Sequence, residues 1–153
     1  DRKYELRNLD GGILVQQENN DILTIDELKV VTNTKPTEDT IKSMLFGWQV
    51  LKHVKSNAII TVKDNTTVGI GAGQVSRIDA VDIAISKSKA AIKGSILCSD
   101  AFFPFRDSID KISQYNINGV IQPGGSIKDN EVIDACNEHN IPMVFTGRRC
   151  FKH

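Results

Sequence analysis

The 153-residue sequence lacks an excess of either charge and lacks a long apolar run. Its 19 basic and 19 acidic residues balance, which disfavours nucleic acid and membrane surfaces as partners because both select a basic face. No stretch approaches the roughly 18 apolar residues that span a bilayer, and no secretory signal opens the chain. These absences favour a cytoplasmic protein, and the length suits one domain with a substantial core.

Cysteine is also scarce. The three residues Cys98, Cys136 and Cys150 are odd in number and far apart, so a disulfide framework is disfavoured. No Cys-x-x-Cys or His-x-x-x-His spacing is present that would predict a zinc site. We therefore expect no metal site, and we interpret the three thiols as small apolar core residues.

The periodicity of the apolar residues predicts an α/β fold. Helical spacing indicates a helix over residues 36–54, capped by Thr37, and another helix after the capping box Ser76-Arg77-Ile78-Asp79. Short strands are expected over residues 11–17, 28–32, 58–62, 67–73, 95–98, 120–122 and 142–146. Strands and helices alternate in the second half, which predicts a layered mixed sheet, partly parallel, with helices on its faces. Residues 1–10 are polar and are interpreted as a truncated end.

Three segments follow the last three expected strands: residues 100–107, 123–126 and 147–153. In sheets with parallel strands, ligands bind beyond the carboxyl ends of the strands. We therefore expect these segments to meet at a ligand site. The first is the most distinctive, because three of the six phenylalanines of the chain lie within four residues there. This composition suits a wall for a flat heteroaromatic ligand. An ordinary strand-to-helix turn with Phe102 and Phe103 in the core is equally open.

Two glycine-containing segments have more than one interpretation. Gly69-x-Gly71-x-Gly73 departs from the dinucleotide-binding pattern, and it indicates either two backbones in close approach or a loop near a ligand. The turn 123–126 leads into a helix, with Ser126 and Asp129 as a capping box. Its N–H groups and the helix dipole would suit an anion, although a plain tight turn explains the same residues.

Three polar groups are candidates for a site. The Asn57 amide both donates and accepts, as a site that holds another amide requires, but a turn residue that satisfies its own backbone would look the same. Arg149, beside Arg148, could clamp a phosphate, or the pair could be a solvated basic end. Lys52 and His53 are adjacent on a helix and do not share a face, so we interpret them as solvent or interface residues.

Five segments in order give the sequence a resemblance to a known family over nearly its whole length. They are Lys-His-Val-Lys-Ser-Asn at 52–57, Val-Gly-Ile-Gly-Ala-Gly-Gln with Ser-Arg at 68–77, Ser-Asp-Ala-Phe-Phe-Pro-Phe-Arg-Asp at 99–107, Gln-Pro-Gly-Gly-Ser at 122–126 and Phe-Thr-Gly-Arg-Arg-Cys-Phe-Lys-His at 145–153. Together they resemble the C-terminal portion of the bifunctional AICAR transformylase/IMP cyclohydrolase family of purine biosynthesis. Five ordered segments of this length are highly specific.

The resemblance implies a cytidine-deaminase-like fold and a folate-dependent formyltransferase, which moves the formyl group of 10-formyltetrahydrofolate to the 5-amino group of AICAR and gives FAICAR. It implies a homodimer through the transformylase region, and it allows a potassium ion near Asp100. The site residues that it implies are Asn57 as the catalytic residue, Phe102, Arg149 and His153 for AICAR, and Ile78, Pro104, Phe105, Asp107 and Ser126 for the folate. Asp107 would bind the pterin edge, and Arg149 the phosphate.

The resemblance also implies what the chain does not carry. Residues 1–153 match the C-terminal half of the transformylase region, without its first half or the cyclohydrolase domain. The catalytic lysine-histidine pair of the family belongs to the first half, and Lys52-His53 is a different segment. We therefore expect the isolated chain to be inactive. The alternative is a stand-alone module that binds nucleotide or folate without catalysis. The zinc ligands of the related deaminases are absent.

Overall fold

The computed structural model describes residues 3–153. Their strands are β1 (Tyr4–Leu9), β2 (Gly12–Gln17), β3 (Lys29–Val30), β4 (Ile59–Lys63), β5 (Thr66–Gly71), β6 (Ile96–Ser99), β7 (Gly119–Gln122) and β8 (Met143–Phe145). Their α-helices are α1 (Glu38–Leu51), α2 (Arg77–Ser88), α3 (Asp107–Ser113) and α4 (Asp129–Glu138), and the 3-10 turns are η1 (Ile25–Glu27) and η2 (Lys89–Ile92). The strands and helices of the body lie close to the ranges that the periodicity predicts.

Six of the strands form one mixed sheet in the order β3-β8-β7-β6-β4-β5. β6, β7 and β8 run parallel to one another, whereas β3, β4 and β5 join antiparallel. The parallel part comes from the second half of the chain, where a helix follows each of β6 and β7 and returns the chain to the same edge. The predicted fold class, a layered mixed α/β sheet, is confirmed.

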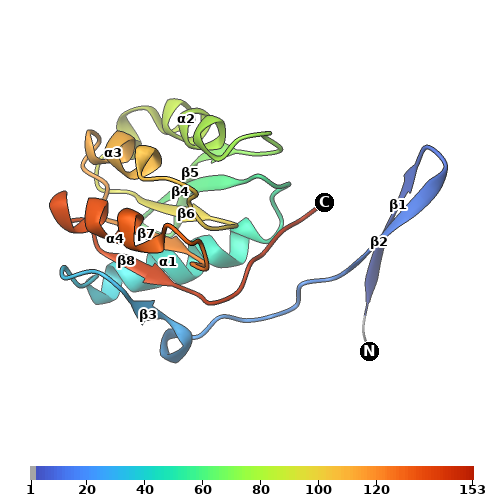
Figure 1. Cartoon of the computed structure of the whole chain (residues 1–153), viewed down its shortest axis with the longest axis horizontal. Helices are drawn as coiled ribbons and strands as arrows, with labels where there is room; N and C mark the ends of the chain where they lie inside the picture. Colours follow the sequence, from blue (N-terminus) through green and yellow to red (C-terminus); the bar gives the residue numbers. More distant parts are fainter. Residues whose placement is uncertain (1–2) are drawn as a thin grey trace.

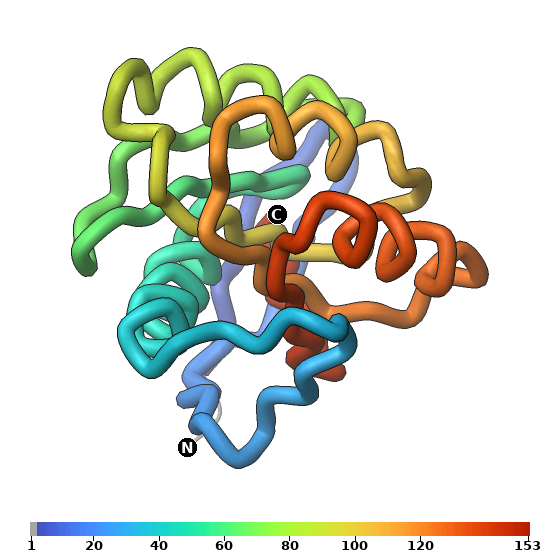
Figure 2. The backbone as a smooth tube through the Cα atoms, turned by 90° about the vertical axis from the view of Figure 1, so that its left-hand side faces the viewer, coloured from blue at the N-terminus to red at the C-terminus, as the bar shows by residue number. Residues whose placement is uncertain are grey.

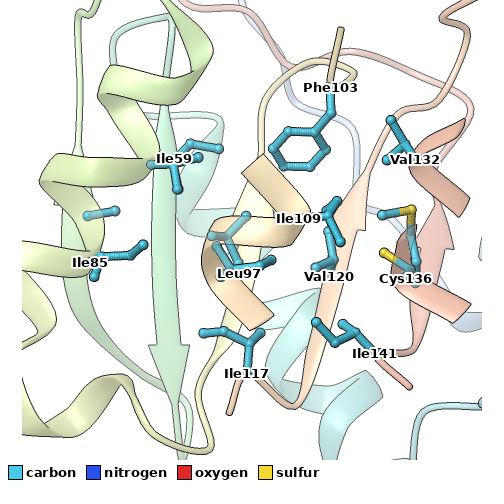
Figure 3. Packing of buried hydrophobic residues seen from close by; sticks show 14 of the residues in the cluster. Ile59, Ile85, Leu97, Phe103, Ile109, Ile117, Val120, Val132, Cys136 and Ile141 are labelled. Carbon is cyan, nitrogen blue, oxygen red and sulfur yellow. The ribbon is translucent and has the colours of Figure 1, made fainter. Parts of the chain in front are cut away.

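Helices cover both faces of this sheet, α2, α3 and α4 on one side and α1 on the other (Figure 1). Successive strand residues point to opposite faces, so each strand supplies both cores. The first core contains Ile59, Leu97, Val120 and Met143, and the second contains their chain neighbours Ile60, Cys98, Ile121 and Val144. Figure 3 shows the first core, in which Phe103 packs beside Ile109. Burial on both faces explains why these strands are apolar without alternation.

Polar side chains fix two of the helix starts as the sequence predicts. The Thr37 hydroxyl accepts a hydrogen bond from the Thr40 N–H at 3.2 Å, and Ser76 accepts one from Asp79 at the same distance. The capping box predicted at Ser126 forms only in part: the Ser126 N–H donates to Asp129 Oδ1 at 3.2 Å, but α4 begins at Asp129 and follows Lys128 as its cap. The Ser126 hydroxyl accepts instead from the Lys128 N–H at 3.1 Å.

The glycines of β5 allow α2 to lie directly on the sheet. A Cβ at Gly71 would lie 2.0 Å from the carbonyl oxygen of Ala80, and one at Gly69 would lie 2.2 Å from that of Ala84. Close approach of two backbones is therefore the interpretation of Gly69-x-Gly71-x-Gly73 that the structure confirms.

The polar segment before residue 11 contains a strand that the sequence analysis did not predict, β1. β1 pairs antiparallel with β2 across the Asp10-Gly11 turn, with Leu6 opposite Val15. This hairpin stands apart from the layered body in Figure 1 and lies behind it in Figure 2. It touches the other end of the chain: Gln16 Nε2 donates to the Phe151 carbonyl at 2.7 Å, and the His153 N–H donates to Gln16 Oε1 at 3.0 Å.

The three cysteines are free and buried, as predicted. Burial raises the pKa of Cys136 to about 12 and holds the pKa values of Cys98 and Cys150 well above the usual value. The thiols are therefore protonated at neutral pH and act as small apolar residues. No helix of residues 3–153 has both the length and the apolar character to cross a membrane.

Candidate functional site

Two adjoining hollows lie at the carboxyl ends of β6, β7 and β8. The first, of about 340 Å³, is lined by Asn57, Val75, Ser76, Arg77, Ala101, Phe102, Pro104, Arg149 and Phe151. The second, of about 430 Å³, is lined by Phe102, Pro104, Phe105, Gly125, Ser126, Ile127, Lys128 and Arg149. Each volume is within the usual range for a small-molecule site. The two hollows share Phe102, Pro104 and Arg149, and the second is lined by residues of all three segments after the parallel strands, so these segments meet as predicted.

Arg149 stands at the junction of the hollows between two aromatic rings. Its guanidinium carbon lies 4.9 Å from the centre of the Phe102 ring and 5.7 Å from that of Phe151. Cation–π contacts of this kind orient a guanidinium without neutralising its charge. Arg149 has no acidic partner within residues 3–153, whereas Arg148 is paired with Glu27 at 2.6 Å. The arginine that faces the hollows therefore keeps its donors for an anionic ligand.

The second hollow is apolar at its centre and polar at one edge. Phe105 is 52% exposed, and the ammonium of Lys128 lies 5.0 Å from the centre of its ring. Lys128 is also paired with Glu131 at 3.0 Å. Phe103, in contrast, is completely buried in the core. Both interpretations of the aromatic segment are thus correct for different residues: Phe103 belongs to the core, and Phe102 and Phe105 line the hollows.

Asn57 lies at the edge of the first hollow with most of its amide already bonded. Its Nδ2 donates to the carbonyls of Gln74 at 2.9 Å and Val75 at 3.1 Å. Its Oδ1 accepts from Arg77 Nη2 at 2.9 Å. Both N–H donors are therefore engaged, and one lone pair of Oδ1 is the group that Asn57 can still offer to a ligand.

A buried ion pair lies beneath Asn57. Asp100 is fully buried and Arg77 is 7% exposed. Arg77 Nη1 donates to Asp100 Oδ1 and to the carbonyl of Ala58, and the Ser56 hydroxyl donates to Asp100 Oδ2. Both oxygens of this carboxylate are thus engaged within the chain, and its charge is matched by Arg77. Asp100 therefore does not fit the potassium ion that the resemblance allows, and we derive no step through that ion.

The turn 123–126 does not offer free N–H groups to an anion. The N–H groups of Gly125 and Ser126 donate to the Asp129 carboxylate at 2.7 and 3.2 Å, and the Gly124 N–H donates to Gln122 Oε1 at 3.1 Å. The plain-turn interpretation is the one that the structure supports, and Ser126 reaches the second hollow as part of that turn.

Three of the expected site residues do not line either hollow. Ile78, in the first turn of α2, is half-buried against the first core. Asp107 is exposed at the start of α3, where its carboxylate accepts from the Ser108 N–H at 2.7 Å. His153 lies beside the hairpin, with its ring 6.0 Å from that of Phe151. Asn57, Phe102, Pro104, Phe105, Ser126 and Arg149 are the expected residues that the fold brings together.

Two contributors to the site were not expected from the sequence. Arg77 was interpreted only as part of a helix cap, and no local pattern indicates that its side chain turns inward to Asp100. Phe151 carries a readable signal, because residues two apart in an extended segment share a face and Arg149 precedes it by two.

Lys52 and His53 lie away from the hollows, in agreement with the interpretation of this pair as solvent or interface residues. Lys52 Nζ donates to the carbonyl of Asp21 at 3.3 Å, and His53 is exposed. No cluster of three or more His, Cys, Asp or Glu side chains within residues 3–153 is arranged to hold a metal ion. The chemistry that the described residues offer is thus binding and orientation by one arginine, one amide oxygen and aromatic faces.

Fold and site together define an α/β domain with two adjoining hollows at the carboxyl ends of its parallel strands. Comparison with known proteins assigns the domain to a family. The model of the AICARFT/IMPCHase bienzyme family matches residues 1–87. The chain is 52% identical to the bifunctional purine biosynthesis protein PurH of Persephonella marina and 50% identical to that of Aquifex aeolicus, with 100% and 98% of this chain covered. The chain therefore belongs to the AICARFT/IMPCHase bienzyme family.

The chain spans about 30% of the length of these two relatives. Among solved structures, two crystal forms of RibD from Acinetobacter baumannii are similar, with TM-scores of 0.48 and 0.43 at 12% and 10% identity. They cover 71% and 68% of this chain and 34% and 33% of the RibD chains. These scores are low, so the fold class rests on the sheet and helices themselves.

Proposed function

We propose that this chain acts in de novo purine biosynthesis, and that its residues 1–153 form the C-terminal half of an AICAR transformylase region. In this role it supplies part of the site for formyl transfer from 10-formyltetrahydrofolate to AICAR. Membership of the bienzyme family supports the proposal. The observation that carries it is the guanidinium of Arg149, which has no acidic partner among residues 3–153 and lies beside Phe102 and Phe151 where the two hollows meet.

The two hollows suit the two ligands of this reaction. AICAR joins an aromatic ring to a phosphate, which matches Phe102 beside Arg149 in the first hollow. The pterin and benzoyl rings of the folate are flat, which matches Pro104, Phe105 and Ser126 in the second. Ile78 and Asp107 would border the folate, and His153 the nucleotide, as the resemblance implies.

In the reaction, the 5-amino nitrogen of AICAR attacks the formyl carbon and a new N–C bond forms. The bond from the formyl carbon to N10 of the folate then breaks, and one proton moves from the amine to N10. The products are FAICAR and tetrahydrofolate. The amine is a weak nucleophile because its lone pair is delocalised into the imidazole, so its orientation matters. In this proposal Asn57 accepts a hydrogen bond from a substrate N–H, which is supported by the remaining lone pair on Oδ1 beside the bond from Arg77.

The proton transfer needs a base that the described residues do not place at the hollows. We propose that the first half of the transformylase region supplies it, in a cytoplasmic homodimer, and that the 153-residue chain alone does not turn over. The cyclohydrolase activity would belong to another part of the longer protein. A stand-alone binding module is the second candidate, because both hollows are formed within this chain.

The adjacent arginines allow a matched test. Purified wild-type chain, Arg149→Ala and Arg148→Ala are titrated calorimetrically with AICAR and with a folate analogue, beside a formyl-transfer assay. Loss of a charged hydrogen bond to phosphate predicts about 10- to 100-fold weaker AICAR binding for Arg149→Ala. Arg148→Ala should change it less than about threefold, because Arg148 is paired with Glu27.

Each outcome of the titration decides between the candidates. Weak, Arg149-dependent binding without turnover supports a split active site. Tight binding of either ligand without turnover favours the stand-alone module. Equal effects of the two arginine substitutions would contradict the phosphate site, and turnover by the 153-residue chain would return Lys52 and His53 to consideration.

A further inference from the structure

The burial of the ion pair between Arg77 and Asp100 has an unfavourable desolvation free energy, so a contribution to stability does not by itself explain the pair. Asp100 has no exposed surface and Arg77 has 7%. Removing two charges from water costs several kcal/mol per ion, and apolar replacements of such pairs are often neutral or stabilising. The contacts of the pair indicate a different purpose, because they end at the side chain of Asn57.

The guanidinium of Arg77 is divided between two tasks. Nη1 donates to Asp100 and to the Ala58 carbonyl, at 3.0 Å for the latter, and Nη2 donates to Asn57 Oδ1 at 2.9 Å. Asp100 is itself held by the Ser56 hydroxyl on its other oxygen. The planar fork is thus fixed on one side by a carboxylate and a carbonyl, and its second nitrogen can point only toward Asn57.

These contacts distinguish the two ends of the Asn57 amide. The Oδ1 end faces a guanidinium, which can only donate, and the Nδ2 end faces the carbonyls of Gln74 and Val75, which can only accept. If the amide turned over, N–H groups would face N–H groups and the oxygen would face two oxygens. Without Arg77, one side of this arrangement would be lost and the amide would rotate more freely.

We propose that Arg77 and Asp100 are positioning residues, which hold the Asn57 amide with its oxygen as the acceptor at the edge of the first hollow. Asp100 acts through Arg77, and Arg77 acts through Asn57. For its catalytic consequence the inference rests on the proposed formyl transfer, in which Asn57 orients the attacking amine. Its structural part, the fixed orientation of the amide, is independent of any reaction.

The test uses the full-length gene product that contains these residues, with Arg77→Lys as the main variant. Lysine keeps the charge opposite Asp100, but a single ammonium cannot also reach Ala58 and Asn57 as the fork does. We expect kcat for formyl transfer to fall about 10- to 100-fold, since small misplacement of a reacting group costs rate on this scale. The affinity for AICAR should change less than about threefold, because Arg149 rather than Asn57 holds the phosphate.

Two further variants separate positioning from general damage. The double variant Asn57→Ala with Arg77→Lys should be no slower than Asn57→Ala alone, because both act through one group. Thr61→Val is the matched control, since it breaks a buried hydrogen bond between Thr61 and Ser88 at 2.6 Å on the adjoining strand β4. It should leave kcat within about threefold. If Arg77→Lys does not fold, Asp100→Asn replaces it as the main variant. This substitution keeps the shape of the side chain but removes the charge that holds Arg77, so the same fall in kcat is expected.

Side-chain NMR of the 153-residue chain provides a readout without substrate. We expect the Asn57 NH₂ protons to exchange slowly in the wild type and in Thr61→Val, and at least about tenfold faster in Arg77→Lys. Unchanged exchange in Arg77→Lys, or rate losses that multiply in the double variant, would overturn the inference. A full-length wild type without formyl transfer would refute the proposed function, and the exchange measurement would still decide the positioning role.

Discussion

At the scale of single residues, the carboxylate of Asp110 on α3 is contacted by two side chains, Arg106 and His139. Arg106 donates to both of its oxygens at 2.8 and 2.9 Å, and His139 Nε2 lies 3.0 Å from Oδ1. The hydrogen bonds from Arg106 are the main cause that lowers the pKa of Asp110 to about 2, with His139 adding to the effect. Arg106 also bonds Glu138 at 2.6 Å, so this group ties α3 to the end of α4.

The lowered pKa gives the folded chain a specific dependence on acid. A carboxylate whose pKa falls on folding stabilises the folded state above its unfolded pKa, and this contribution is lost as the pH falls toward the folded value. For Asp110 the loss should run from about pH 4 to about pH 2. Asp110→Asn should therefore lower the free energy of unfolding at pH 7 slightly and make it decline less steeply below pH 4. Urea unfolding at pH 7, 4 and 3 measures this, and identical slopes for the two proteins would contradict it.

At the scale of elements, the packing of α2 on β5 depends on glycine. The space for a Cβ at Gly71 is occupied by the Ala80 carbonyl, which belongs to the backbone and cannot rotate away. Gly71→Ala should therefore lower the free energy of unfolding by about 2 to 3 kcal/mol, as overpacking of a tight contact does. Denaturant unfolding measures the loss.

A matched glycine provides the control for this prediction. Gly12 at the start of β2 has no atom within 4 Å of a built Cβ. Gly12→Ala should change the free energy of unfolding by less than about 0.5 kcal/mol. A loss of similar size in both variants would mean that the contact with α2 is not the cause.

At the scale of the whole molecule, the two ends of the chain hold each other. Gln16 bonds Phe151 and His153 through both ends of its amide, and Lys152 is paired with Glu5 at 2.6 Å. The hydrogen bond from Lys152 lowers the pKa of Glu5. A two-stranded hairpin is marginally stable by itself, so these contacts help to fix β1 and β2. The C-terminal segment 147–153 also carries Arg149 and Phe151, which line the first hollow. The contacts with the hairpin therefore help to hold one wall of this hollow in place.

Removal of these contacts should free the hairpin without unfolding the body. Gln16→Ala should speed tryptic cleavage at Arg7 severalfold, while the melting temperature changes by less than about 2 °C. Gln17→Ala is the control, because Gln17 points to the opposite face of β2 and is exposed. Electrophoresis of samples taken over time measures the cleavage rate. Equal cleavage rates of the two variants would show that the Gln16 contacts do not hold the hairpin.

The sequence by itself determined the elements of the body and the edge of the sheet at which the three candidate segments meet. Apolar residues at helical spacing predict α1, a β-branched run predicts β4, and a short apolar run predicts β6. Helices between the parallel strands bring the segments 100–107, 123–126 and 147–153 to one edge. The five ordered segments determined the family, which the comparisons confirm. These features are local or follow from chain connectivity, so no distant contact is needed to predict them.

Only the tertiary structure decided which groups at that edge remain free. Arg77 and Asp100 are 23 residues apart, and their pairing depends on α2 lying on the sheet. Asp129 occupies the N–H groups of the turn 123–126, and Glu27 occupies Arg148 from a distance of 121 residues. Arg149 stays unpaired among residues 3–153 because the fold places aromatic rings beside it, at 4.9 and 5.7 Å, rather than carboxylates. Hydrogen-bond and charge partners far apart in the chain leave no local pattern. The sequence therefore predicted which segments meet at this edge, but not which of their groups remain free.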